Sequence, residues 1–285
     1  MTLKEALAKA GEALIKNNIE DAPLESELLL CHTLRIDRVQ LYLELDRKLT
    51  PEQEATFWQF VNRRLKDEPT AYITGRREFY GLDFYVDPAV LIPRPESELL
   101  VEQALKIARS APINTIADIG TGCGAIAISL AKKLPEVKIY ATDISAEALA
   151  VARINSKKHD VTARITLLQG NLLEALPEPV DLIIANLPYV RKRDIPKRGP
   201  LSFEPLVALD GGAAGLDKIR QLCRQLSGKL RPNGGLLLEI GRGQGEAVTE
   251  LLRRLFPSAL IEVTPDLAGI KRAVRVCLKA VSRER

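Results

Sequence analysis

The sequence predicts an α/β protein in which a small helical bundle and a β-hairpin linker precede a mostly parallel sheet of seven strands. Three observations lead to this fold class. The first 75 residues carry apolar side chains at helical spacing. Within residues 76–90, the run from Phe79 to Val86 alternates and has a glycine in its middle, so it resembles a hairpin. From about residue 112 onward, strand patterns alternate with helix patterns, which is typical of a parallel sheet. We therefore expect a helical domain over residues 1–75, a linker over 76–90 and the sheet domain over 91–285.

The helical segment has a regular apolar stripe and a clear helix start. Leu3, Ala6 and Ala10 lie three or four positions apart, so they share one face of a helix. Thr50 precedes a proline and stands three residues before Gln53, an arrangement that predicts a capped helix N-terminus. The segment carries no obvious chemistry. Packing and recognition of a macromolecular substrate are both open as its role.

After the linker, two prolines enclose an arginine. Pro93 and Pro95 flank Arg94, and the acidic residues that follow predict the start of a helix. A stiff structural connector explains these residues. As chemistry, the restricted backbone is expected to hold Arg94 rigidly enough to meet a carboxylate, and we assign this arginine to the cofactor site.

The sheet domain is predicted as a regular alternation of elements. Strands are predicted over residues 114–119, 138–142, 165–169, 181–185, 235–240, 260–264 and 271–278. Helices are predicted over residues 125–133, 146–155, 215–230 and 244–256. Ligands of such sheets bind beyond the carboxyl ends of the strands, so the residues after each strand are the first candidates for a site.

A glycine-rich turn follows the first predicted strand of the sheet. Its residues Gly120, Thr121, Gly122, Cys123 and Gly124 lead into a helix. Glycines allow the backbone to come close to a ligand above a helix N-terminus. The pattern also fits the dinucleotide fingerprint G-x-G-x-x-G/A, so the glycines alone do not choose the cofactor.

Residues around this turn favour S-adenosylmethionine over a nicotinamide dinucleotide. Asp118 precedes the glycines and suits the charged amino and sulfonium groups of S-adenosylmethionine. Asp143 ends the next strand, where a carboxylate accepts hydrogen bonds from ribose hydroxyls. After the third strand, Leu172 offers an apolar surface to an adenine ring, and Asn171 offers a partner for its amino group. An ordinary turn is the alternative interpretation of these last two residues.

The fourth predicted strand leads into a candidate clamp for an amino group, made by Asn186, Leu187, Pro188 and Tyr189. The side-chain oxygen of Asn186 can accept one N–H. The carbonyl of Leu187 can accept a second, because Pro188 stiffens the backbone after it. The ring of Tyr189 gives a planar group a surface to lie against. We expect these four residues to be catalytic and Asn186 to contact the cofactor as well. A strand followed by a proline turn is the simpler interpretation of the tetrapeptide alone.

Composition argues against several other classes of protein. The chain has 2 histidines and 4 widely spaced cysteines, so neither a metal site nor a disulfide framework is expected. No apolar stretch approaches the roughly 18 residues of a membrane span, and the start of the sequence lacks the apolar core of a secretory leader. We therefore expect a cytoplasmic protein. The formal net charge of +4 permits an acidic partner such as RNA without requiring one.

Four segments resemble the glutamine methyltransferases of the PrmC/HemK family, which modify peptide chain release factors: residues 79–84, 91–98, 118–124 and 203–212. The resemblance covers nearly the whole chain. It implies a Rossmann-like methyltransferase domain that uses S-adenosylmethionine, preceded by a helical domain for substrate recognition. It also implies that the methyl group goes to the side-chain nitrogen of the glutamine in a release factor's Gly-Gly-Gln motif.

Two residues depart from the family pattern. The family usually has Asn-Pro-Pro-Tyr, whereas this chain has Leu187, which still supplies a carbonyl but lacks the rigidity of a second proline. Related proteins often have aspartate at the position of Asn171, so the cofactor could bind more weakly here. Asn-Leu-Pro-Tyr is also typical of ribosomal RNA adenine dimethyltransferases. A nucleic-acid amino-methyltransferase acting on adenine or cytosine is therefore the alternative function.

The segment after the clamp is basic and irregular. A solvated loop is the first interpretation of its charges, and attraction to an acidic substrate surface is the second. The segment from 190 to about 212 has little regular pattern, and we predict that it orders on substrate binding. Nucleic acid is not required, a contact with the ribosome stays open, and a monomer is expected. The five charged residues are Arg191, Lys192, Arg193, Lys197 and Arg198.

Overall fold

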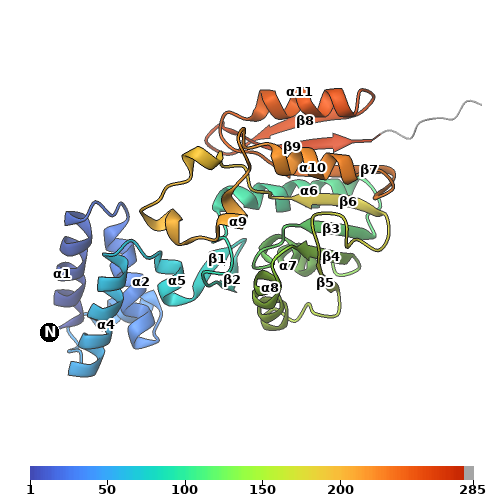
Figure 1. Ribbon diagram of the computed structural model, residues 1–285. Helices are drawn as coiled ribbons and strands as arrows, with labels where there is room; N and C mark the ends of the chain where they lie inside the picture. The colour runs from blue at the N-terminus through green and yellow to red at the C-terminus, as the bar shows by residue number, and fades with distance from the viewer. Residues whose placement is uncertain (279–285) are drawn as a thin grey trace, which may run out of the picture. The chain divides into compact units, whose positions relative to one another are not determined.

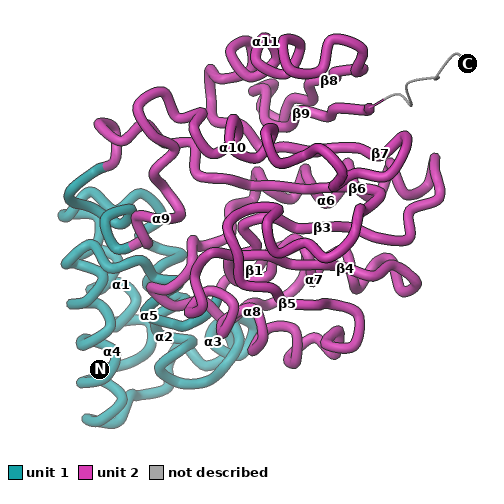
Figure 2. Tube along the Cα trace, turned by 45° about the vertical axis from the view of Figure 1, so that its right-hand side comes forward, with its two compact units in different colours: residues 1–76, 196–203 teal, residues 77–195, 204–285 magenta. Residues whose placement is uncertain are grey.

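The computed structural model describes residues 1–278 and contains two compact units (Figure 2). One unit comprises residues 1–76 and 196–203, and the other comprises residues 77–195 and the chain from residue 204 onward. The first boundary lies one residue beyond the predicted end of the helical domain. Each unit is described by itself below.

Helices make up the first unit, as the sequence predicts. Leu3, Ala6 and Ala10 are fully buried in its core. The side chain of Thr50 accepts a hydrogen bond from the backbone nitrogen of Gln53, and the side chain of Gln53 accepts one from the backbone of Thr50. This capping box confirms the predicted helix start. The described helices of residues 1–76 are α1 (Leu3–Lys16), α2 (Ala22–Leu34), α3 (Arg38–Leu43), α4 (Pro51–Arg64) and α5 (Thr70–Thr74) (Figure 1).

A two-stranded hairpin follows, formed by β1 (Arg76–Phe79) and β2 (Leu82–Tyr85). Its turn places Gly81 at φ +72°, a conformation that glycine adopts without strain. The proline-rich segment then forms a short 3₁₀ helix, η1 (Pro95–Ser97), which runs into α6 (Glu98–Ser110). The predicted hairpin and the predicted helix start are both confirmed.

The seven-stranded, mostly parallel sheet is also confirmed (Figure 1). The strand order is β5-β4-β3-β6-β7-β9-β8; β9 pairs antiparallel with both β7 and β8, and the other neighbouring pairs are parallel. The strands are β3 (Thr115–Ile119), β4 (Lys138–Asp143), β5 (Ile165–Gln169), β6 (Val180–Ala185), β7 (Leu230–Glu239), β8 (Leu260–Pro265) and β9 (Lys271–Cys277). The larger helices between them are α7 (Ala125–Lys133), α8 (Ala146–Lys158), α10 (Asp217–Gln225) and α11 (Gly245–Leu255).

One predicted helix is wrong at its end. The sequence predicts a helix over residues 215–230, but α10 ends at Gln225 and Leu230 already belongs to β7. Gly228 at φ +71° lies in the turn between the two elements. Val180 pairs with Leu230, whereas Leu182 pairs with Gly235, so β7 contains a bulge. The strand therefore begins five residues before residue 235, where the sequence predicts its start.

The irregular segment from 190 to 212 contains only short helical turns. These are η2 (Lys192–Asp194), η3 (Pro200–Phe203) and α9 (Leu206–Leu209). The lack of long regular elements agrees with the sequence pattern. Ordering of this segment on substrate binding stays a prediction.

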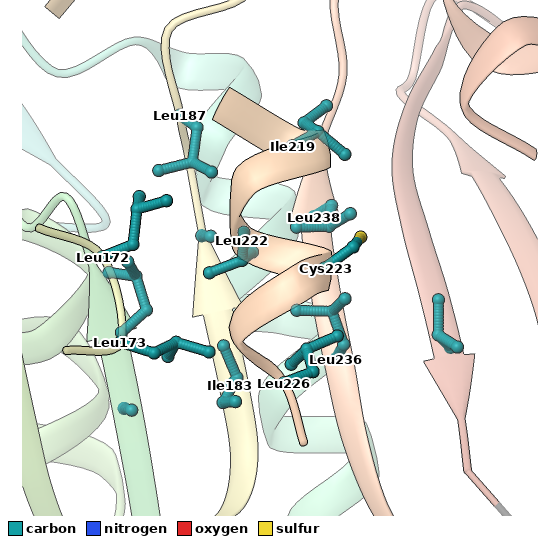
Figure 3. Close-up of a cluster of buried hydrophobic side chains, with 14 of the residues drawn as sticks. Leu172, Leu173, Ile183, Leu187, Ile219, Leu222, Cys223, Leu226, Leu236 and Leu238 are labelled. Atoms are coloured by element: carbon teal, nitrogen blue, oxygen red, sulfur yellow. The ribbon is translucent and has the colours of Figure 1, made fainter. Parts of the chain in front are cut away.

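A buried hydrophobic cluster beside the sheet also reaches the tetrapeptide after β6. Figure 3 shows α10 running alongside β6 and β7, with Leu222 and Cys223 among the side chains packed there. Leu187 belongs to this cluster and is 4% exposed. The side chain that replaces the usual proline therefore anchors the tetrapeptide in the hydrophobic core.

The strand order positions the candidate site. In the sheet, β4 lies next to β3 on one side, and β6 lies next to β3 on the other side. Such a switch in strand order opens a crevice at the carboxyl ends of the strands. The glycine-rich turn follows β3 and the candidate clamp follows β6, so the sheet brings them to the same edge.

Candidate active site

A pocket lies at the carboxyl ends of β3, β4, β5 and β6. Its empty space, including the part open to solvent, is about 750 Å³. Residues after four different strands therefore meet around one cavity. The predicted site residues that line it are Gly120, Gly122, Asp143, Asn171, Leu172, Asn186, Leu187 and Pro188.

The glycine-rich turn brings its backbone to this pocket. Gly120 and Gly122 have φ values of +72° and +56°, which glycine adopts readily. The backbone nitrogens of Gly120 and Thr121 both donate to the carbonyl of Thr142, each at 2.9 Å, so the turn is fixed to β4. A Cβ added at Gly120 would lie 3.7 Å from the carbonyl oxygen of Asn186. The turn and the candidate clamp are thus immediate neighbours.

Two other residues of the turn support it from behind the pocket lining. Cys123 is buried, its carbonyl accepts a hydrogen bond of 2.9 Å from the side chain of Asn155, and burial raises the pKa of its thiol to about 12. Gly124 precedes α7 at φ +85°, and a Cβ there would lie 2.9 Å from the side chain of Ile128. We find both residues in positions that shape the turn.

Asp118 lies beneath the turn and is 1% exposed. Its carboxyl accepts hydrogen bonds from the hydroxyl of Thr121 at 2.6 Å and from the backbone nitrogen of Ala127 at 3.2 Å. Burial raises its pKa to about 6, against the effect of these hydrogen bonds. In this arrangement Asp118 ties the turn to the first residues of α7.

Asp143 occupies the position that the sequence predicts, at the end of β4 and in the pocket. One carboxyl oxygen accepts from the backbone nitrogen of Gly122 at 2.9 Å, and the other accepts from that of Ser145 at 3.0 Å. Burial raises its pKa, and the backbone hydrogen bonds oppose that rise. A carboxylate has about four lone-pair sites, so these contacts leave capacity for further donors.

Asn171 and Leu172 lie after β5, where the sequence predicts them. The side-chain nitrogen of Asn171 donates to Glu174 at 3.1 Å, which places its oxygen on the opposite side of the amide. Leu172 has φ +57°, a conformation unusual for a residue with a side chain, and its carbonyl accepts a hydrogen bond from Thr142. Strained backbone of this kind is often found at binding sites.

The candidate clamp faces the same pocket. Asn186, Leu187 and Pro188 line the pocket directly after β6. The side-chain nitrogen of Asn186 donates to the hydroxyl of Ser97 at 2.9 Å. The hydroxyl of Ser97 in turn donates to Glu239 at 2.5 Å.

Tyr189 is placed beside the lining residues of the pocket. Its hydroxyl lies 3.5 Å from Glu239, and burial raises its pKa to about 12. The side-chain nitrogen of Gln244 donates to the carbonyl of Tyr189 at 3.1 Å. The backbone nitrogen of Gly211 donates to the carbonyl of Val190 at 2.8 Å, so a neighbouring segment holds the residues after the clamp.

Arg94 meets a carboxylate, as its rigid surroundings predict, and that carboxylate belongs to the chain itself. Its guanidinium forms an ion pair with Glu204, which also accepts a hydrogen bond of 3.2 Å from the backbone nitrogen of Ile92. Arg94 is not among the residues that line the pocket. The ion pair joins two of the segments on which the family resemblance was based.

Three residues around the clamp carry no role in the sequence interpretation: Ser97, Glu239 and Gln244. Glu239 had a usable signal, because a carboxylate at the end of the apolar run in β7 is costly to bury unless it has a partner. Ser97 and Gln244 had none, since their contacts depend on how distant segments fold together. Lys218 of α10 also lines the pocket without having been predicted.

Comparison with known proteins agrees with this geometry. A family model described as the PrmC N-terminal domain matches residues 5–75, and one described as the methyltransferase small domain matches residues 95–198. The release factor glutamine methyltransferase of Moorella thermoacetica is 44% identical to this chain, over 100% of both chains. The chain belongs to the release factor glutamine methyltransferase family.

Another member and a solved structure complete the comparison. The release factor glutamine methyltransferase of Koribacter versatilis is 40% identical over 96% of this chain and 98% of its own. The crystal structure of a ribosomal protein L11 methylase from Lactobacillus delbrueckii subsp. bulgaricus covers 68% of this chain and 84% of its own, with a TM-score of 0.50 and 23% identity. That similarity supports the methyltransferase fold. The family resemblance and the fold class predicted from the sequence are both confirmed.

Proposed function

We propose that this protein transfers a methyl group from S-adenosylmethionine to the side-chain nitrogen of the glutamine in the Gly-Gly-Gln motif of peptide chain release factors. The observation that carries the proposal is that Asn186 and Leu187 share one pocket with Gly120 and Asp143. A clamp for an amino group and a candidate cofactor site are therefore adjacent. Full-length similarity to release factor glutamine methyltransferases supports the same substrate.

The pocket residues fit S-adenosylmethionine. The carboxylate of Asp143 is suited to ribose hydroxyls, and Leu172 is suited to the adenine ring. The side-chain oxygen of Asn171 is suited to the amino group of adenine, because the nitrogen of that amide is bonded to Glu174. The backbone at Gly120 allows close approach of the remainder of the molecule. Asp118 and Arg94 would act indirectly, through the glycine-rich turn and through Glu204 respectively.

The clamp addresses the main chemical difficulty of the reaction. An amide nitrogen is a poor nucleophile because its lone pair is delocalised into the carbonyl group. S-adenosylmethionine supplies an electrophilic methyl group on a positively charged sulfonium. The side-chain oxygen of Asn186 and the carbonyl of Leu187 would each accept one N–H of the glutamine amide. They would thereby aim its lone pair at the cofactor and stabilise the positive charge that develops on nitrogen.

The other two clamp residues would hold the planar amide. Pro188 lines the pocket, and Tyr189 is fixed through its carbonyl by Gln244. Residues 1–75 would supply substrate recognition, and the release factor would be the protein partner. We expect the enzyme to act as a monomer in the cytoplasm, without a requirement for nucleic acid. Within residues 1–278, no helix combines the length and the apolar character needed to cross a bilayer.

Parallel labelling tests the proposal against its alternative. The protein is incubated with S-adenosylmethionine carrying a radioactive methyl group and with a release factor, ribosomal RNA or DNA. We expect label in the release factor and none in a variant factor whose Gly-Gly-Gln motif is changed to Gly-Gly-Ala. Label in RNA or DNA, with none in the release factor, would instead establish the nucleic-acid amino-methyltransferase.

A further inference from the structure

The serine at the start of α6 uses its hydroxyl for something other than helix capping. A serine at this place ordinarily accepts a hydrogen bond from the first turn of its helix. Ser97 makes no such bond, although it is 4% exposed. Its hydroxyl instead lies between Glu239 of β7, at 2.5 Å, and the side chain of Asn186, at 2.9 Å. Three elements far apart in the sequence therefore meet at one oxygen atom.

The order of donors and acceptors along the hydrogen bonds from Asn186 to Ser97 and from Ser97 to Glu239 determines the orientation of the Asn186 amide. An ionised carboxylate only accepts hydrogen bonds, so the single proton of the Ser97 hydroxyl is directed to Glu239. The oxygen of Ser97 then faces Asn186 as an acceptor, and only the nitrogen end of the Asn186 amide can donate to it. The oxygen end of that amide is consequently turned away from Ser97.

We propose that Ser97 and Glu239 are positioning residues, which fix the Asn186 side chain with its oxygen available to the substrate amide. The inference rests on the proposed function, because it explains how one of the two acceptors of the clamp is oriented. An amide that could rotate freely would present its N–H groups to the substrate for part of the time. Those groups would repel the N–H groups of the substrate glutamine.

The arrangement also predicts a dependence on pH. Arg272, Glu96 and Tyr189 are the charged and titratable groups that act on Glu239, and Arg272 itself pairs with Glu96 and with Asp266. Burial raises the pKa of Glu239 to about 7, more than Arg272 and the hydrogen bond from Ser97 lower it. When Glu239 is protonated it can donate to Ser97, and the direction of the hydrogen bonds that orient Asn186 is then no longer fixed. Methyl transfer should therefore slow as the pH falls through about 7.

A purely structural role is the alternative, in which the Ser97–Glu239 contact only joins α6 to β7. The two roles differ in what they change. Loss of a structural contact lowers stability and leaves the pH profile of the chemical step in place. Loss of orientation lowers the rate of that step and removes its dependence on the ionisation of Glu239.

The experiment measures single-turnover methylation of a release factor between about pH 6 and about pH 8.5. Three variants, S97A, S97T and E239Q, are compared with the wild type. S156A is the matched control, because Ser156 is also buried and, among residues 1–278, its hydroxyl bonds only to the backbone of its own helix. S-adenosylmethionine affinity is measured for each protein by calorimetry, as a test of folding.

We expect S97A to reduce the rate at high pH roughly tenfold or more, with wild-type cofactor affinity. S97T should recover most of the rate, because it keeps the hydroxyl. E239Q should keep a measurable rate and lose the acid limb of the profile, whereas S156A should match the wild type.

An S97A rate and pH profile equal to those of the wild type would overturn the positioning role. If S97A does not fold, an acid limb that persists in E239Q would overturn it equally. A wild-type enzyme that labels no release factor would refute the proposed function itself, which separates the two failures.

Discussion

Glu239 should make the protein less stable as the pH rises, and replacing it by glutamine should remove that loss. The carboxyl group is 2% exposed, and burial raises its pKa from 4.5 to about 7. A group whose folded pKa is raised contributes stability that is fully present below the unfolded value and is lost as the pH rises through the folded value. The relevant window therefore extends from about pH 4.5 to about pH 7.

The size of the effect follows from the shift. A rise of roughly 2.5 pKa units, at about 1.4 kcal/mol for each unit, corresponds to about 3–4 kcal/mol. The difference in the free energy of unfolding, E239Q minus wild type, should therefore be about 2–3 kcal/mol larger near pH 8.5 than near pH 5. In a domain of 150–250 residues this corresponds to a difference of roughly 5–10 °C in Tm.

Calorimetric unfolding of both proteins at the two pH values measures this difference. The comparison cancels the contribution of Asp118, whose pKa is also raised but which is present in both proteins. A Tm difference that is the same at both pH values would refute the reasoning. Greater destabilisation of E239Q at high pH would show that the electrostatic attraction between Glu239 and Arg272 outweighs the cost of burial. If the prediction holds, the enzyme retains a costly buried carboxylate beside its clamp, as expected of a group kept for function.

Three further predictions concern the cofactor, the clamp and the basic segment. D143A should weaken S-adenosylmethionine binding roughly tenfold or more in calorimetry, because charge-assisted hydrogen bonds are lost; unchanged affinity would remove Asp143 from the site. G211A should lower the methylation rate roughly 100-fold, since its Cβ would lie 2.7 Å from the Pro188 carbonyl and displace the clamp; a normal rate would contradict this. Neutralising the five cations of residues 191–198 should weaken release-factor binding and reduce its salt dependence, whereas unchanged binding would indicate a solvated loop.

The sequence predicted the edge of the sheet at which the site lies, for a simple reason. Carboxyl ends of parallel strands share one edge, so residues that follow different strands must converge there. Gly120, Asp143, Asn171 and Asn186 each follow or end such a strand, and all four line the pocket. Strand identity was sufficient to bring them together.

Contacts between distant segments could not be predicted in the same way. Ser97 and Glu239 are 142 positions apart, and nothing in local periodicity indicates that α6 and β7 place them in contact. Likewise, the rigid surroundings of Arg94 indicated a carboxylate partner but not that it would be Glu204. The early start of β7 was missed because the bulge depends on pairing with β6, which apolar spacing does not reveal.

Leu187 shows a third limit of the sequence interpretation. Its backbone carbonyl was the reason to include it in the clamp, and the loss of a proline ring suggested a less rigid turn. The structure buries its side chain in the cluster shared with Leu172 and α10 (Figure 3). Packing thus holds the turn at a place where the family usually relies on a restricted backbone.

The most direct test of the account is the single-turnover rate of methyl transfer to a release factor by N186A, measured with S-adenosylmethionine at saturating concentration. The account predicts a loss of roughly 100-fold or more, since one of the two oxygen acceptors for the substrate amide is removed. Cofactor affinity is determined in parallel, so that weaker binding is not mistaken for slower chemistry. A rate close to that of the wild type would contradict the central claim that Asn186 holds the glutamine nitrogen for reaction.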